Sequence, residues 1–193
     1  MHFANDYILN NNQPESDYMV YILLTDMPNR ISKTIKRFGF WHYSHVSLST
    51  SMIDSDFYSY VGKKGFFKEQ PLNHPTFRGK PINCALYAVP VTKEECELVT
   101  KRIEHHIEVS HSFTYSYIGL IFSYLDIQLK MKKQYTCAGF VSEMLHKSGV
   151  MKERKYRRLY SPERFHKKLR NRLVFRGTLK EMLEKFNPKK ETA

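Results

Sequence analysis

Tyr135–Gly149 has the sequence YTCAGFVSEMLHKSG, which is typical of a helix with a cysteine in its first turn. Small or apolar side chains recur at i, i+3, i+4 and i+7 and form one stripe: Val141, Met144, Leu145 and Ser148. Thr136 can cap the start of this helix and Gly149 can end it. We therefore expect a helix that buries one face and carries Cys137 at its N-terminal end.

The predicted position of Cys137 favours nucleophilic chemistry. Unpaired backbone N–H groups and the positive end of the helix dipole meet at a helix N-terminus, and both stabilise a thiolate. The same N–H groups, that of Cys137 among them, are able to hold an oxyanion. The alternative is a buried structural thiol with no chemical role.

A thiol nucleophile needs a base, and Tyr43–Thr50, YSHVSLST, supplies the candidate. Val46 and Leu48 alternate with polar residues, which predicts a half-buried strand that begins near His45. His45 lies 92 positions before Cys137, so only folding brings the two together, as is usual for Cys/His sites. The alternative for His45 is a surface histidine at a strand end.

These stretches resemble a known family. CAGFVSEML is similar to the C-[SA]-x-F-V signature that opens the catalytic helix of NlpC/P60 cysteine peptidases, and the order His before Cys resembles its circularly permuted branch. That branch includes the YiiX/YaeF-like proteins and the lecithin–retinol acyltransferase group. Together YILLTDM, SHVSLS, FYSYVGKKG and YTCAGFVSEML resemble small bacterial members of it, from about Met19 to about Gly177.

The resemblance implies an α+β fold: a circularly permuted, papain-like NlpC/P60 domain with an antiparallel sheet packed against the Cys-bearing helix. It also implies acyl transfer, with Cys137 as nucleophile and His45 as general base. In permuted relatives the group that orients the imidazole comes from the strand after the His. Here the next predicted strand is Phe57–Val61, which offers Ser59 in its middle and Asp56 at its start. Both stay open, and Tyr21 or Thr25 on the first predicted strand is a candidate oxyanion donor.

The length of 193 residues indicates one domain. We expect a loose lead-in over residues 1–17, the domain over 18–186 and a charged tail over 187–193. Further strands are predicted at Asp17–Thr25, Ile82–Val91 and Leu173–Arg176, and further helices at Tyr115–Leu129 and after the capping residues Thr92, Ser161 and Thr178. Pro28–Phe40 has the spacing of a short amphipathic helix, and Gly62–Gly79 is expected to be a loop.

Cysteine use and the N-terminus predict a cytoplasmic protein. Met1–Ser16 is polar and lacks the apolar core of a signal peptide, and no stretch is long enough to cross a membrane. The three cysteines have neither disulfide nor metal-ligand spacing. The cluster His105, His106 and His111 matches no metal motif and is expected at the surface, so we predict no metal and no cofactor.

The formal charge of +12 predicts association with polyanions. Five basic residues of the C-terminal third form the candidate face: Lys155, Arg157, Arg158, Lys167 and Lys168. Too few aromatic residues lie among them to favour nucleic acid. Two functional classes follow. One is a thiol hydrolase or acyltransferase for a small amide or ester, such as a wall-peptide fragment or a lipid ester. The other is a papain-like scaffold, without strong catalysis, that binds an anionic polymer or membrane surface.

Overall fold

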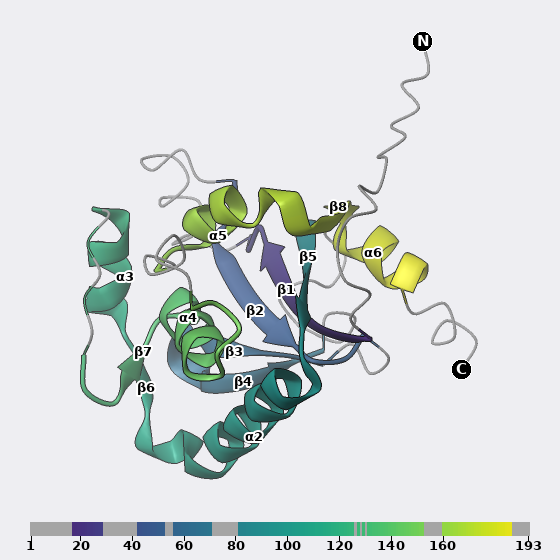
Figure 1. Cartoon of the computed structure of the whole chain (residues 1–193). Helices are drawn as coiled ribbons and strands as arrows, with labels where there is room; N and C mark the ends of the chain where they lie inside the picture. The colour runs from purple at the N-terminus through teal and green to yellow at the C-terminus, as the bar shows by residue number, and fades with distance from the viewer. Residues whose placement is uncertain are drawn as a thin grey trace.

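The computed structural model describes residues 17–28, 42–52, 56–70, 81–125, 127, 129, 131–152 and 160–186. These residues form a mixed α+β structure around a six-stranded antiparallel sheet with the strand order β4-β3-β2-β1-β5-β8 (Figure 1). The strands are β1 Tyr18–Thr25, β2 His45–Ser49, β3 Phe57–Val61, β4 Gly65–Glu69, β5 Asn83–Val91 and β8 Leu173–Thr178. The predicted fold class is confirmed at this level.

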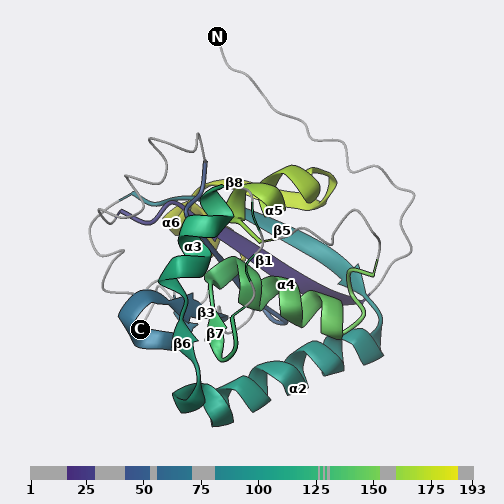
Figure 2. The same cartoon turned by 90° about the vertical axis from the view of Figure 1, so that its left-hand side faces the viewer.

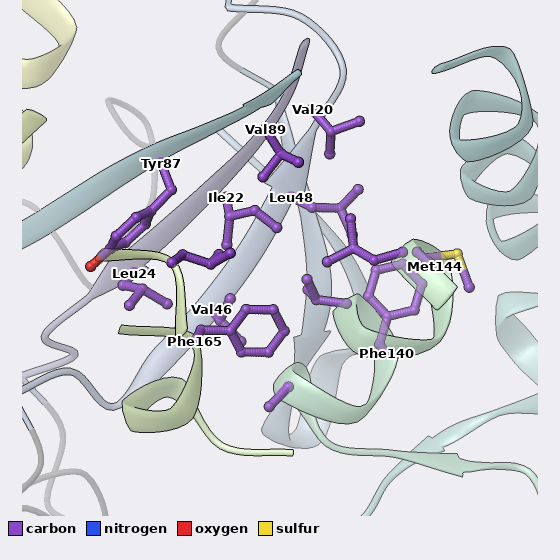
Figure 3. Close-up of a cluster of buried hydrophobic side chains, with 14 of the residues drawn as sticks. Val20, Ile22, Leu24, Val46, Leu48, Tyr87, Val89, Phe140, Met144 and Phe165 are labelled. Atoms are coloured by element: carbon purple, nitrogen blue, oxygen red, sulfur yellow. The ribbon is translucent and has the colours of Figure 1, made fainter. Parts of the chain in front are cut away.

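The central strand β1 owes its place to an apolar sequence, YMVYILLT, that is buried on both sides. Antiparallel partners flank it, with Leu24 opposite Val46 of β2 and Ala85 of β5. Val20, Ile22 and Leu24 belong to one hydrophobic cluster, whereas Leu23 belongs to a second cluster on the other face. Figure 3 shows the first cluster, to which these three side chains belong together with Phe140 and Met144.

Helices cover both faces of the sheet (Figures 1 and 2). The first cluster includes residues of α4 and α2, and the second includes residues of α6. The α-helices are α2 Lys93–Val109, α3 Tyr117–Tyr124, α4 Cys137–Lys147, α5 Pro162–Lys168 and α6 Leu179–Phe186, and the short 3-10 helices are η1 Gly62–Lys64, η3 Ser110–Ser112 and η5 Arg170–Arg172.

The prediction for α4 is confirmed in detail. The helix begins at Cys137, and the Thr136 hydroxyl accepts a hydrogen bond of 2.9 Å from the Gly139 N–H. The predicted stripe is buried. Gly149 follows the helix with φ +81°, a left-handed conformation that glycine adopts without strain.

Other capping predictions are confirmed as well. Thr92 and Glu95 form the reciprocal capping box at the start of α2, and Thr178 and Glu181 form one at the start of α6. Ser161 caps α5, with Pro162 in its first turn. The predicted strands at β1, β2, β3, β5 and β8 are present, with ends shifted by one or two residues.

Three predictions need correction. The strand at β2 is buried at every residue rather than half-buried, because hydrophobic clusters cover the sheet on both faces. The predicted loop Gly62–Gly79 contains β4, which forms an antiparallel hairpin with β3. The helix expected over Tyr115–Leu129 spans only Tyr117–Tyr124, and before it Thr114–Tyr115 (β6) pairs in parallel with Gln134–Tyr135 (β7).

Several expectations lie outside the described residues: most of Pro28–Phe40, nearly all of the lead-in 1–17 and the tail 187–193. Within the described residues no helix is both long enough and apolar enough to cross a bilayer.

Candidate active site

A carboxylate holds the imidazole of His45. His45 is the first residue of β2, and its Nε2 lies 2.6 Å from Oε1 of Glu69, the last residue of β4. The exposed fractions are 5% for His45 and 1% for Glu69, so this hydrogen bond lies away from water. In such a setting the charge of Glu69 acts strongly on the imidazole.

The balance of interactions raises the pKa of His45. Burial by itself lowers the pKa, because it disfavours the charged ring. The negative charge of Glu69 and hydrogen bonds with Cys137 and Glu69 outweigh burial and raise the pKa to about 10. The imidazolium form of His45 is therefore favoured at neutral pH.

Cys137 lies on the other side of this imidazole. It is the first residue of α4, and its thiol is close enough to His45 to raise the imidazole pKa by hydrogen bonding and by charge. Since Glu69 occupies Nε2, the nitrogen left to face the sulfur is Nδ1. The predicted meeting of Cys137 and His45 is thus found in the structure, with Glu69 as a third member. Cys137 is only 2% exposed, so the described residues nearly enclose the sulfur.

Neither residue expected in the third position orients His45. Ser59 is buried, but its hydroxyl donates to the carbonyl oxygen of Val46 at 2.7 Å. Asp56 lies 2.6 Å from the Lys68 ammonium and accepts a hydrogen bond from the Gln70 amide. Both residues therefore have other partners, and Glu69, one strand further along the chain, takes the expected place.

Glu69 is not among the site residues predicted from the sequence because a loop is expected over Gly62–Gly79, although the sequence carries a signal for β4. The aromatic runs FYSYV and GFFKE are separated by a short Gly-Lys-Lys segment, a spacing typical of a β-hairpin.

The proposed oxyanion donor Tyr21 lies on the wrong face of the sheet. It packs against the second hydrophobic cluster, whereas Cys137 belongs to the first, because neighbouring residues of β1 point to opposite faces. A different tyrosine, Tyr115, packs against the cluster that contains Cys137. Burial, and then the charge at Cys137, raise the pKa of Tyr115 well above its usual value, so its hydroxyl stays protonated and able to donate.

The other two cysteines lack this environment. All three cysteines are free. Burial, with a smaller effect of Glu181, raises the pKa of Cys84 to about 12, and burial also raises the pKa of Cys96. The two thiols therefore serve as internal references for Cys137.

A groove of about 740 Å³ runs between α3 and α4. Small side chains line it on both helices, among them Ser116, Gly119 and Ser123 from the α3 side and Gly139 from α4. It passes Thr136, the residue directly before Cys137. The groove therefore reaches the start of α4, where Cys137 follows Thr136 in the chain.

The basic face is only partly described. Lys155, Arg157 and Arg158 lie outside the described residues. Lys167 and Lys168 are exposed on α5, and the Lys167 ammonium lies 3.5 Å from Glu163.

One of the three clustered histidines is not at the surface. His106 is buried among aromatic rings, and its Nδ1 lies 3.3 Å from the Tyr60 hydroxyl. The surrounding rings are those of Tyr60, Phe66, Phe113, Tyr135 and Phe140. Burial lowers its pKa to about 4, so it is a neutral core residue. Among the described residues, no group of three or more His, Cys, Asp and Glu is arranged to hold a metal ion.

Comparison with known proteins adds no identity to this geometry: no family model, no curated protein and no solved structure matches the chain.

Proposed function

We propose that this protein is a thiol hydrolase or acyltransferase that acts on an amide or ester through an acyl-enzyme. The observation that carries the proposal is the buried contact of 2.6 Å between His45 and Glu69, on an imidazole that also interacts with Cys137. A nucleophile, a base and a carboxylate that orients the base form the arrangement used for nucleophilic acyl transfer. The resemblance to the permuted NlpC/P60 branch supports the same chemistry.

Acylation begins with the sulfur as thiolate and His45 as imidazolium, which the raised pKa of His45 favours. The thiolate attacks the carbonyl carbon, a C–S bond forms, and the carbonyl oxygen becomes an oxyanion. The imidazolium then gives its proton to the leaving nitrogen or oxygen as the C–N or C–O bond breaks. Glu69 stabilises the charged ring and holds its orientation throughout.

Deacylation reverses the proton path. Water, or an acceptor amine or alcohol, attacks the thioester while His45 removes its proton, and the C–S bond breaks to return the thiolate. Water gives a carboxylic acid, whereas an acceptor gives a transferred acyl group.

Two groups are candidates for stabilising the oxyanion. The Cys137 N–H lies in the first turn of α4, where backbone N–H groups have no carbonyl partner within the helix. The Tyr115 hydroxyl is the second candidate, and Tyr115→Phe is expected to slow acylation about 10- to 100-fold without loss of folding. An unchanged rate in Tyr115→Phe would remove Tyr115 from the mechanism.

The proposal is tested by treating the protein with 4-nitrophenyl acetate and locating the acetyl group by mass spectrometry. We expect a burst of 4-nitrophenol and an acetyl group on Cys137, with Cys84 and Cys96 unmodified. His45→Ala should lose the burst, and circular dichroism checks that the variant is folded when the burst is measured. Acetylation of lysines alone, or equal modification of all three cysteines, would contradict the proposal.

A further inference from the structure

Several large apolar side chains of helix α3 point outward, although Leu120 and Phe122 are half-buried. Its buried positions are the small residues Gly119 and Ser123, together with the capping residue Ser116. Ile121 is 60% exposed, and Leu125, directly after the helix, is 65% exposed. A surface helix of a globular protein normally does the opposite and buries its large apolar residues. Within the part of the chain that the structure describes, these exposed side chains of α3 therefore lack the covering that their chemistry favours.

The exposed residues form one continuous stretch of chain, which we call the α3 apolar patch: Tyr117, Ile118, Ile121, Leu125, Ile127 and Leu129. Most of the large hydrophobic side chains that are exposed in the described part of the chain belong to it. Figures 1 and 2 show α3 at the periphery of the molecule, beside α4 and away from the centre of the sheet. An apolar patch gathered on one peripheral element marks an interaction surface.

The charges around the α3 apolar patch indicate the chemistry of its binding partner. Lys132 and Lys133 follow it closely and are exposed, and exposed Lys64 lies in the η1 turn, whose Gly62 approaches the Tyr117 hydroxyl. Over residues 117–133 the sequence has three lysines and one aspartate, in a protein of net charge +12. Apolar side chains flanked by lysines match an anionic bilayer, in which acyl chains lie below negative headgroups. A second copy fits less well, because its lysines would face these lysines across the interface.

We propose that the α3 apolar patch docks on the surface of an anionic lipid bilayer. The exposed side chains enter the region between headgroups and acyl chains, and Lys132 and Lys133 lie against the headgroups. The helix has eight residues, so it lies in the interface and does not span the membrane. Docking places the groove between α3 and α4 at the bilayer surface, because α3 forms one wall of that groove.

Docking is separate from catalysis, and the experiment keeps the two apart. The full chain is mixed with sedimenting vesicles of phosphatidylcholine, with or without about one third phosphatidylserine. We expect binding to the anionic vesicles, weaker binding to the neutral ones, and loss of the difference at high salt. Cys137→Ala should bind like the unmodified protein, so a failed catalytic proposal leaves this result unchanged.

The matched variants carry the same change on two helices. Ile121→Glu with Leu125→Glu should weaken binding at least about tenfold. Leu98→Glu with Ile107→Glu, on exposed apolar residues of α2, should leave it unchanged. Lys132→Glu with Lys133→Glu should weaken binding to anionic vesicles alone. All six positions are exposed, so the variants are expected to fold, and circular dichroism checks this.

Three results would overturn the proposal. The first is no binding to either kind of vesicle. The second is equal weakening by the α2 and α3 variants. The third is a dimer in solution that Ile121→Glu with Leu125→Glu dissociates while vesicles are not bound, since the patch would then be an interface between two copies of this chain.

Discussion

At the scale of single residues, Glu69 favours the charged form of the His45 imidazole, on which the proposed chemistry depends. It is buried, it contacts only one nitrogen of His45, and its charge is the first cause that raises the imidazole pKa against the effect of burial. A buried carboxylate without a cationic partner would be costly, and the His45 imidazolium is the partner that Glu69 has in the structure.

Glu69→Gln is expected to keep the side-chain shape but remove the charge. The pKa of His45 should fall, since burial then acts with less opposition, and the imidazolium would be lost at lower pH. We expect the rate of Cys137 acetylation by 4-nitrophenyl acetate to fall about 10- to 100-fold at neutral pH, with an alkaline limb shifted to lower pH.

Asp56→Asn is the matched control for that change. It removes one carboxylate charge just before β3, where Asp56 pairs with Lys68 rather than with His45. Its acetylation rate and pH profile should match those of the unmodified protein. Equal effects of the two variants would show that Glu69 acts through general charge and not through the imidazole.

The sequence was informative about Cys137 and His45 because each lies in a local pattern: a capped helix start and a strand start. The third member of the site has no such pattern. Glu69 meets His45 only because β4 folds back on β3, and a contact between residues 24 positions apart is not visible in local periodicity. Likewise, the sequence alone does not show which of Tyr21 and Tyr115 packs on the Cys137 side of the molecule, because that depends on which cluster each side chain meets.

At the scale of elements, the start of α4 positions the nucleophile. The Thr136 side chain accepts the Gly139 N–H, and this cap fixes where the first turn begins and hence where Cys137 lies.

Thr136→Ala is expected to lower the free energy of unfolding by about 1 kcal/mol and to slow acetylation of Cys137. Thr92→Ala at the α2 capping box should cost a similar amount of stability without slowing acetylation, because α2 carries none of the three site residues. Thr136→Ser should restore both properties. Denaturant unfolding and the acetylation rate measure the two effects, and a slowed Thr92→Ala would mean that stability alone controls the rate.

Helix α3 shows where element prediction from hydropathy reaches its limit. The apolar run from Tyr115 to Leu129 predicts a helix packed against the body of the protein, yet many of its large side chains are exposed. The hydropathy of a side chain indicates whether burial is favourable, but not whether another element of the fold covers that side chain. The small buried residues Gly119 and Ser123 were the available signal that this helix approaches its neighbour through its polar face.

At the scale of the whole molecule, the two hydrophobic clusters that flank the sheet make burial of an unpaired charge costly. His106 packs against Tyr60 and Phe140 of the first cluster, and burial there lowers its pKa to about 4. The unfolded chain binds a proton at this histidine from about pH 6.5 downward, whereas the folded protein does so only near pH 4. Acidification across this window therefore favours the unfolded state.

His106→Phe should remove part of this acid sensitivity, because a phenyl ring suits the aromatic surroundings and does not titrate. Thermal unfolding between about pH 7 and pH 4 should show a smaller loss of Tm in the variant than in the unmodified protein. His105→Phe is the control, since that neighbouring histidine is exposed. Identical slopes for all three proteins would show that His106 does not titrate as described.

An ion pair of Cys137 with His45, supported by Glu69, should be visible in how the rate of Cys137 alkylation by iodoacetamide depends on pH. We expect Cys137 to react already at about pH 6, where Cys84 and Cys96 do not, and His45→Ala to abolish this reaction. A Cys137 rate that rises only near pH 8.5, as for an ordinary thiol, and that His45→Ala leaves unchanged would contradict the ion pair.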